Sequence, residues 1–154
     1  MSEINQYAAL PYVVTQNGLL VCIITTRGAG RWIIPKGWPK ADLSPDTMAA
    51  IEACEEAGLV GSTSTVPIGS YVYRKQLHVF ATVDCRVTVF PMEVQTQLLK
   101  WREKGQRRIE WVSPKKAAKR IEEPELAKLI INLSVWLTGH PTIHAQASEK
   151  TNLS

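Results

Sequence analysis

The chain has 154 residues, of which 45% are hydrophobic and 21% are charged, and it carries a formal net charge of +4. This length and composition are typical of a single globular domain with a buried core. No apolar run is long enough to cross a bilayer and no basic-then-apolar leader opens the chain, so we expect no membrane association, no secretory signal and a cytoplasmic location.

The first half of the chain predicts strands followed by one helix. A Gln-Asn-Gly turn divides the apolar stretch Tyr7–Thr26, which indicates an antiparallel hairpin. A short apolar strand at 32–34 is flanked by loops. Ser44 as N-cap, proline at the first helical position and Gly58 as a left-handed C-terminal residue predict a helix over Pro45–Ala57.

The second half predicts three strands and two helices. Alternating apolar and polar residues predict strands at Thr65–Arg74 and Leu77–Val89, and a shorter one at Ile109–Val112. Ser-Pro at 113–114 and Glu-Pro at 123–124 each open a helix, the second with a stripe of leucine and isoleucine.

This order of elements indicates the fold class. Strands come first and last around a central helix, with further helices at the end, which predicts an α/β fold with a mixed sheet packed between helices. Residues 139–154 are polar and lack periodicity. We therefore expect one domain over residues 1–138 and a flexible C-terminal tail over residues 139–154.

Charge and cysteine content leave several functions open. Lys100–Arg120 holds nine basic and two acidic residues, which favours an anionic partner, either a phosphate-rich small molecule or nucleic acid. A solvated basic face without any partner is an equally common explanation. The three cysteines are far apart and lack metal-ligand spacing, so buried reduced thiols are expected.

The central helix carries a carboxylate cluster. Glu52, Glu55 and Glu56 have spacings that place them on one helix face, with Cβ atoms roughly 5–6 Å apart. The helix has no Lys or Arg, so either cations from elsewhere in the chain or a divalent metal ion must compensate their charge. Oxygen-only ligands suit Mg²⁺ or Mn²⁺. From the helix alone, an exposed acidic patch is about as well supported.

The surrounding residues resemble a known family. The stretch GWPKADLSPDTMAAIEACEEAGL, residues 37–59, resembles the Nudix hydrolase signature G-x5-E-x7-R-E-U-x-E-E-x-G-U, where U is a bulky aliphatic residue. Six positions are in register: Gly37, Glu52, Glu55, Glu56, Gly58 and Leu59. The preceding RWIIPKG is similar to the lead-in of the family's diphosphoinositol polyphosphate and diadenosine polyphosphate hydrolases. The resemblance covers about residues 8–138 and implies a Nudix-type α/β/α sandwich.

Two positions depart from that signature. Leu43 stands where the signature has its first Glu, and Ile51 replaces its Arg. In the family this Arg orients the carboxylates through a salt bridge. Either a metal ion and a loop cation such as Lys36 or Lys40 replace the lost pair, or the protein binds its ligand without turnover.

The resemblance implies a metal-dependent phosphoric anhydride hydrolase. Mg²⁺ or Mn²⁺ would be held by Glu52, Glu55, Glu56 and the Gly37 carbonyl, and water would attack phosphorus in a diphosphate (pyrophosphate) linkage. Glu52 is the preferred general base, Glu55 supports the metal ions, and Glu103 in a later loop and Glu110 are the other candidates for the base.

The expected substrate is a highly charged small-molecule polyphosphate, such as a diphosphoinositol polyphosphate or a dinucleoside polyphosphate. Nucleic acid would enter only as a 5′-end substrate. Five residues are candidates for substrate binding: Arg27, Arg31, Lys36, Trp38 and Arg74. For the first two arginines a solvated loop is almost equally well supported, and Trp38 could instead anchor its loop.

Two other classes of function compete with the enzyme. A catalytically weak Nudix-fold module would bind nucleotide or RNA and form no product. A basic RNA-binding domain would lose affinity steeply with salt and would not depend on the carboxylates.

Overall fold

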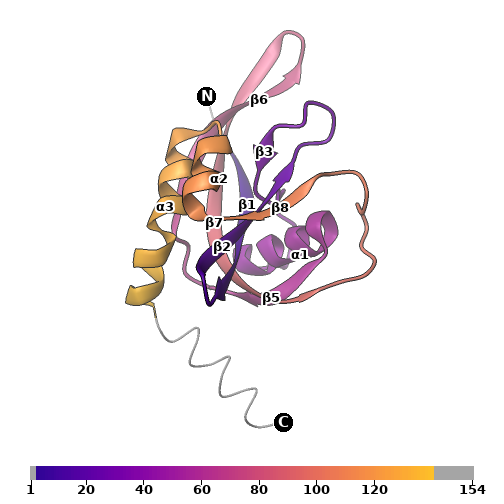
Figure 1. The fold of residues 1–154 in the computed structure, drawn as a ribbon. Coiled ribbons are helices and arrows are strands. Elements are labelled where there is room, and N and C mark those ends of the chain that lie inside the picture. The colour runs from indigo at the N-terminus through magenta and orange to yellow at the C-terminus, as the bar shows by residue number, and fades with distance from the viewer. Residues whose placement is uncertain (1–2, 141–154) are drawn as a thin grey trace.

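A computed structural model describes residues 3–140 of the chain (Figure 1). The predicted tail therefore lies outside the described residues, except for Gly139 and His140. The elements in chain order are β1 (Ile4–Thr15), β2 (Gly18–Thr25), β3 (Trp32–Ile33), β4 (Lys36–Gly37), α1 (Pro45–Ala57), β5 (Leu59–Thr63), β6 (Gly69–His78), β7 (Ala81–Gln97), β8 (Ile109–Val112), α2 (Pro114–Arg120) and α3 (Pro124–Gly139).

The strands form one mixed sheet, as the order of elements predicted. The main path is β3-β2-β1-β7-β5, while β4 pairs with β1, β6 with β7 and β8 with β2. Only β1 and β7 are parallel, and the other pairs are antiparallel. The two long strands β1 and β7 thus form the centre of the sheet, and the short strands extend it on both sides.

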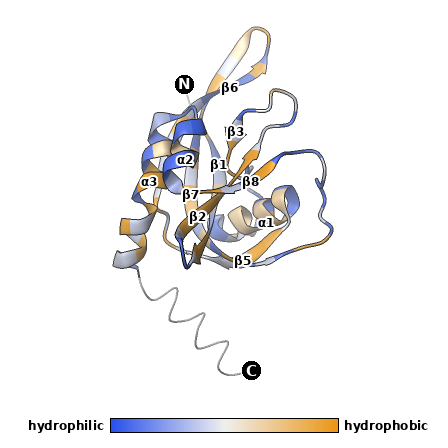
Figure 2. Ribbon diagram, in the orientation of Figure 1, coloured by the Kyte–Doolittle hydropathy of each residue, from blue (hydrophilic) through white to orange (hydrophobic). Residues whose placement is uncertain are grey.

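Helices cover both faces of this sheet. On one face the small residues of α1 (Ala49, Ala53 and Ala57) pack against Phe90 and Met92 of β7 in one core cluster. On the other face a separate cluster joins the sheet to α2 and α3. Figure 2 shows hydrophobic residues along β2 and β5 and hydrophilic ones over most of α2. The predicted α/β/α sandwich is confirmed.

Local signals placed several elements correctly. The hairpin pairs Thr15 with Gly18 around a two-residue turn. Gly58 ends α1 in the left-handed conformation, with φ 69°, and its N–H donates to the carbonyls of Ala53 and Cys54. Ser113 caps α2 by accepting from the Lys116 N–H. The predicted strand Ile109–Val112 is confirmed as β8.

The middle of the sheet corrects the sequence-based strand boundaries. β6 begins at Gly69 rather than Thr65, and β7 continues to Gln97 rather than ending at Val89. Residues 89–92 are buried on both sides of the sheet, so the alternation that marks a half-exposed strand disappears there. The five-residue strand β5 was not predicted, and it pairs with the end of β7 across a bulge.

All three cysteines are free thiols, as expected. Cys22 and Cys85 are buried, but Cys54 is only partly buried. Within residues 3–140, none of the helices has the length and apolar character that a bilayer crossing requires.

Candidate functional site

Two of the three helix carboxylates share one cavity. Glu52 and Glu56 lie one turn apart on α1 and line a cavity of about 350 Å³, which Glu103 also lines from the loop before β8. That loop is attached to the helix, because the Glu103 N–H donates to the Glu55 carbonyl at 3.0 Å. The side chain of Glu55 lies elsewhere: it pairs with Arg102 at 3.4 Å and lines a neighbouring hollow.

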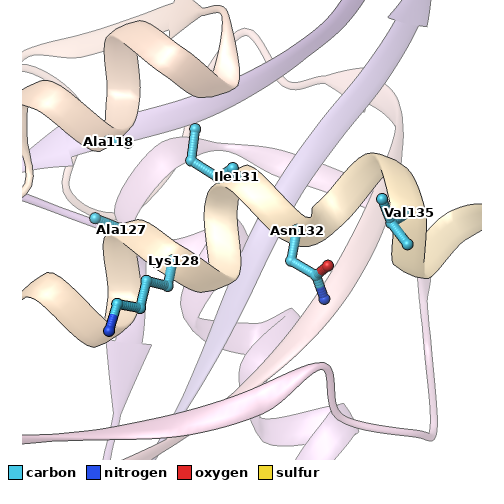
Figure 3. A pocket seen from close by; sticks show the side chains of 6 residues that line it. All are labelled: Ala118, Ala127, Lys128, Ile131, Asn132 and Val135. Atoms are coloured by element: carbon cyan, nitrogen blue, oxygen red, sulfur yellow. The ribbon is translucent and has the colours of Figure 1, made fainter.

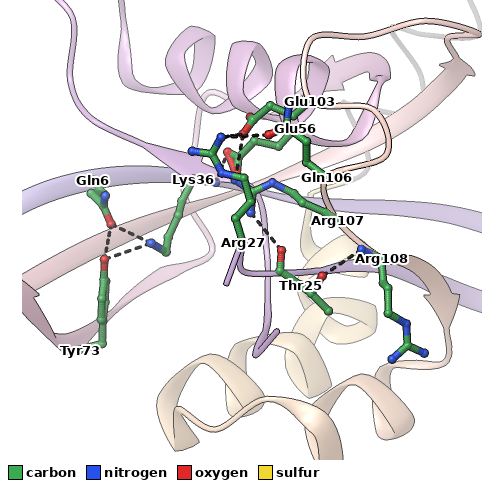
Figure 4. A network of polar contacts seen from close by, with 10 residues as sticks. All are labelled: Gln6, Thr25, Arg27, Lys36, Glu56, Tyr73, Glu103, Gln106, Arg107 and Arg108. Atoms are coloured by element: carbon green, nitrogen blue, oxygen red, sulfur yellow. Dashed lines mark hydrogen bonds and ion pairs between the residues drawn. The ribbon is translucent and has the colours of Figure 1, made fainter. Parts of the chain in front are cut away.

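Glu56 is almost completely buried and has fixed partners on both oxygens. Its side chain is 4% exposed, its Oε2 accepts from the Lys36 N–H at 3.2 Å, and its Oε1 lies 3.2 Å from Arg107 Nη2 (Figure 4). Burial raises the pKa of Glu56 to about 8 in spite of Arg107. Burial also raises the pKa of Glu52, which is joined to Glu56 by a side-chain hydrogen bond.

Gly37 allows Glu52 to approach the backbone. The residue lies in β4, where it pairs with Tyr7 of β1, so Lys36 and Gly37 form a short strand where a loop was expected. A Cβ added to Gly37 would overlap the carboxyl carbon and Oε1 of Glu52. Only glycine, which has no Cβ, allows this close approach at position 37.

The donors in this cavity fit a hard divalent cation. Glu52 and Glu56 supply carboxylate oxygens from a rigid helix. The Gly37 backbone lies close beside the Glu52 carboxyl group because glycine has no Cβ. In the described part of the chain no group of three or more His, Cys, Asp or Glu side chains converges as a metal cage. Mg²⁺ usually binds through one or two carboxylates, waters and substrate phosphates, so two carboxylates are sufficient.

Positive side chains surround the carboxylates. Five line the cavity: Arg27, Lys36, Lys40, Lys75 and Arg107. Lys36 Nζ donates to the Gln6 Oε1 at 3.2 Å and to the Tyr73 hydroxyl at 3.0 Å. Burial, with a smaller effect of Lys75, lowers the pKa of Lys36 to about 8. Such a group retains partial charge near neutral pH in a site that could bind an anion.

Trp38 forms part of the cavity wall. Its side chain is 45% exposed, and Lys75 Nζ lies 5.3 Å from the centre of its ring. The lysine is thus held beside an aromatic surface at the cavity mouth. Of the two strand tyrosines on β6, Tyr71 belongs to the core and Tyr73 hydrogen-bonds Gln6.

The structure does not bring Arg31 and Arg74 into this cavity. Arg31 lies 3.3 Å from Glu122, and Arg74 lies 3.6 Å from Asp84. Both line a separate hollow beside α3. Successive strand residues point to opposite faces, so Arg74 faces away while its neighbour Lys75 faces the cavity.

Sequence reasoning missed three residues of the site: Gln6, Lys75 as distinct from Arg74, and above all Arg107. Arg107 belongs to the basic segment Lys100–Arg120, but nothing in the sequence separates it from the other basic residues there. The Arg107 side chain contacts Glu56. The two loop lysines suggested for this role do not: Lys36 donates to Glu56 only through its backbone N–H, and Lys40 makes no ion pair in residues 3–140.

Three of the nine basic residues of this segment form ion pairs within residues 3–140. Arg102 pairs with Glu55, Arg107 with Glu56, and Arg120 with Glu110. Glu110, a candidate general base, pairs with Arg120 and is not among the residues that line the cavity. The charge of the helix carboxylates is therefore compensated in part by arginines from this segment.

A further hollow is lined by residues of α2 and α3 (Figure 3). Six residues line it: Ala118, Ala127, Lys128, Ile131, Asn132 and Val135. This lining has no carboxylate and a single charged side chain, so it lacks the groups that phosphate chemistry needs.

Solved structures share the fold of the chain at low sequence identity. The Ap4A hydrolase of C. elegans superimposes with a TM-score of 0.64 and 12% identity, over 88% of this chain and 99% of that one. The NUDIX domain of Shewanella oneidensis NrtR, solved in complex with ADP ribose, gives 0.62 and 11%, over 89% and 90%. At such identities the likeness establishes the fold.

Curated sequences add a relationship through the sequence itself. No family model matches the chain. Nudix hydrolase 13 (mitochondrial) of Arabidopsis thaliana is 31% identical over 107 residues, which cover 66% of this chain and 53% of the relative. Nudix hydrolase 12 (mitochondrial) of the same plant is 28% identical, over 66% and 51%. The chain is similar in sequence to Nudix hydrolases and shares the fold of a NUDIX domain. It spans about half the length of these two Nudix relatives.

The buried Nudix-helix carboxylate Glu56 predicts a pH dependence of stability. Its folded pKa of about 8 lies above the ordinary value of 4.5. A carboxyl group whose pKa is raised on folding makes its full contribution to stability below its unfolded pKa. This contribution is lost as the pH rises to the folded pKa of about 8, and the free energy of unfolding falls by on the order of a few kcal/mol. Denaturant unfolding in EDTA between these pH values should show the parent losing stability relative to Glu56→Gln. A difference that stays constant with pH would contradict this expectation.

Proposed function

We propose that the chain is a Mg²⁺- or Mn²⁺-dependent hydrolase of a diphosphate linkage in a highly charged polyphosphate, such as a dinucleoside or diphosphoinositol polyphosphate. One observation carries the proposal: Glu52, Glu56 and Glu103 line a single cavity that five cationic side chains also line. Carboxylates can hold a metal ion and cations can hold phosphates, and a diphosphate hydrolase needs both in one place.

The positions of the three carboxylates favour Glu52 as the general base. Glu103 Oε1 lies 3.1 Å from Arg27 and 3.2 Å from Arg107, so this oxygen already faces two guanidinium groups and is not free to approach a water molecule. Glu52 has no ion pair in residues 3–140, and burial raises its pKa, which makes it the stronger base.

The remaining residues orient the substrate and limit its motion. A divalent ion held by Glu52 and Glu56, when bound, supplies positive charge for phosphate oxygens and acidifies a water molecule. Lys36 is fixed by Gln6 and Tyr73, so its ammonium group can hold an anionic oxygen without a large loss of side-chain entropy. Trp38 supplies an apolar surface beside the phosphate-binding cations.

The charge of the cavity supports a polyphosphate rather than a substrate with one diphosphate group. Three lysines, Lys36, Lys40 and Lys75, line the cavity and form no ion pair in residues 3–140, so each can contact a separate phosphate group. RNA as a general ligand is less well supported, because the arginines at positions 102, 107 and 120 are occupied by glutamates.

A substrate panel tests the proposal directly. The protein is incubated with diadenosine tetraphosphate, a diphosphoinositol polyphosphate and ADP-ribose, each with Mn²⁺, Mg²⁺ or EDTA, and products are followed by ³¹P NMR. We expect metal-dependent cleavage, with the two polyphosphates preferred over ADP-ribose. Saturable binding without product for every compound would instead establish a non-catalytic Nudix-fold binder.

Two neighbouring residues of β6 offer a matched test of the binding site. Lys75 lines the cavity and Arg74 does not, although both are basic residues on the same strand. Lys75→Met should raise KM for the preferred polyphosphate by about 10-fold, the effect of roughly one lost charged contact. Arg74→Met should change KM less than 2-fold. Equal effects of the two substitutions would show that the substrate does not use this side of the cavity.

A further inference from the structure

Arg107 occupies the centre of the carboxylate site. Its side chain is 9% exposed, and its Nη2 lies 3.2 Å from both Glu56 Oε1 and Glu103 Oε1. Figure 4 shows the guanidinium group between these two carboxylates, one from α1 and one from the loop before β8. The arginine therefore joins two elements that are distant in sequence but supply the same cavity.

Thr25 holds both the Arg107 side chain and the backbone of the next residue. Arg107 Nη1 donates to the Thr25 carbonyl at 3.0 Å. The next residue, Arg108, donates its N–H to the Thr25 hydroxyl at 2.9 Å and accepts from the Thr25 N–H at 3.1 Å. These bonds tie the end of the loop to the end of β2, so the guanidinium group starts from a rigid frame and not from a mobile loop.

Stability alone does not explain this arrangement. A buried ion pair gives little net stabilisation, because removing charges from water costs about as much as their attraction returns. Arg107 Nε, moreover, is buried without a hydrogen-bond partner in residues 3–140. The helix α1 has no Lys or Arg of its own, and Ile51 stands where the signature would place one. The cation that orients its carboxylates must come from another element.

We propose that Arg107 is the positioning residue of this Nudix site, which fixes Glu56 for metal binding, in place of an arginine on the helix, and anchors Glu103 of the neighbouring loop beside it. The inference rests on the proposed function. Only a planar guanidinium group can reach both carboxylates and the Thr25 carbonyl together, because its N–H groups diverge in one plane. A lysine at this position keeps the charge but cannot make all three contacts.

Mn²⁺ binding to the protein without substrate separates positioning from simple charge competition. If Arg107 only competed with the metal, Arg107→Met would tighten Mn²⁺ binding. If it positions the ligands, the same substitution should weaken Mn²⁺ binding by at least about 10-fold, the range found when a residue supporting a metal ligand is lost. Arg107→Lys should weaken it to an intermediate extent, and kcat should fall more than KM rises.

The control is Arg108→Met, which removes the same charge from the adjacent residue. The Arg108 side chain points away from the carboxylates and lies 5.2 Å from the Trp32 ring (Figure 4). Mn²⁺ affinity should be measured by EPR or calorimetry for the parent and all three variants. Unchanged or tighter binding in Arg107→Met, or parent-like binding in Arg107→Lys if the Met variant does not fold, overturns the inference. Absence of Mn²⁺ binding in the parent overturns the proposed function, and this inference with it.

Discussion

Replacing Glu56 with Gln should abolish most of the diphosphate hydrolysis while the fold is retained. Glutamine has nearly the same shape as the buried Glu56 side chain, and the pKa of that carboxyl group is already raised to about 8 by burial, so the fold tolerates a neutral group there. The site would lose one of the two carboxylates that share the cavity. Loss of a residue that only supports a metal ligand typically lowers metal affinity or activity by about 10–100-fold. Loss of a metal ligand itself should therefore lower kcat/KM by at least about 100-fold.

The neighbouring carboxylate provides the comparison. Glu55→Gln makes the same chemical change on the same helix, but the Glu55 side chain pairs with Arg102 in a different hollow. We expect this variant to lose less than about 10-fold in kcat/KM, measured by initial rates at saturating Mn²⁺. Equal kcat/KM of the Glu56→Gln variant and the parent would show that Glu56 does not hold the catalytic metal, and would contradict the proposed site.

Replacing Gly37 with Ala should damage the site more than the fold. The new methyl group would overlap the Glu52 carboxyl group, which is the mobile end of a side chain and can move aside. The fold should therefore survive with a small change in Tm. A displacement of about 1 Å in a catalytic group can cost about 100-fold in rate, so we expect a loss of roughly that size in kcat/KM and weaker Mn²⁺ binding.

A second glycine serves as the control for this substitution. A Cβ at Gly139, at the end of α3, would meet nothing within 4 Å. Gly139→Ala should therefore leave kcat/KM and Mn²⁺ affinity within 2-fold of the parent. If Gly37→Ala behaves like Gly139→Ala, then Glu52 does not need its place beside β4, and its assignment as base and ligand fails.

The sequence by itself determined the local structure. Pro45 and Gly58 specify where α1 begins and ends, because backbone preferences act within a few residues. Ser44 is the N-cap residue, but its hydroxyl donates to the Thr47 hydroxyl and caps no backbone N–H. The spacing of Glu52 and Glu56 likewise places both on one face of that helix, whatever surrounds it. The mixed sheet between helices and the resemblance to the Nudix signature followed from such local patterns in chain order.

Only the tertiary structure decided which side chains share the cavity. Glu55 has the same helical spacing as its neighbours, yet Arg102 holds it outside, while Glu103 enters from a loop some fifty residues later. Arg107 joins the site because β8 pairs with β2, and this pairing brings the loop before β8 to Thr25 at the end of β2. Long-range pairing of this kind depends on the packing of the whole sheet, and no spacing between these residues in the sequence records it.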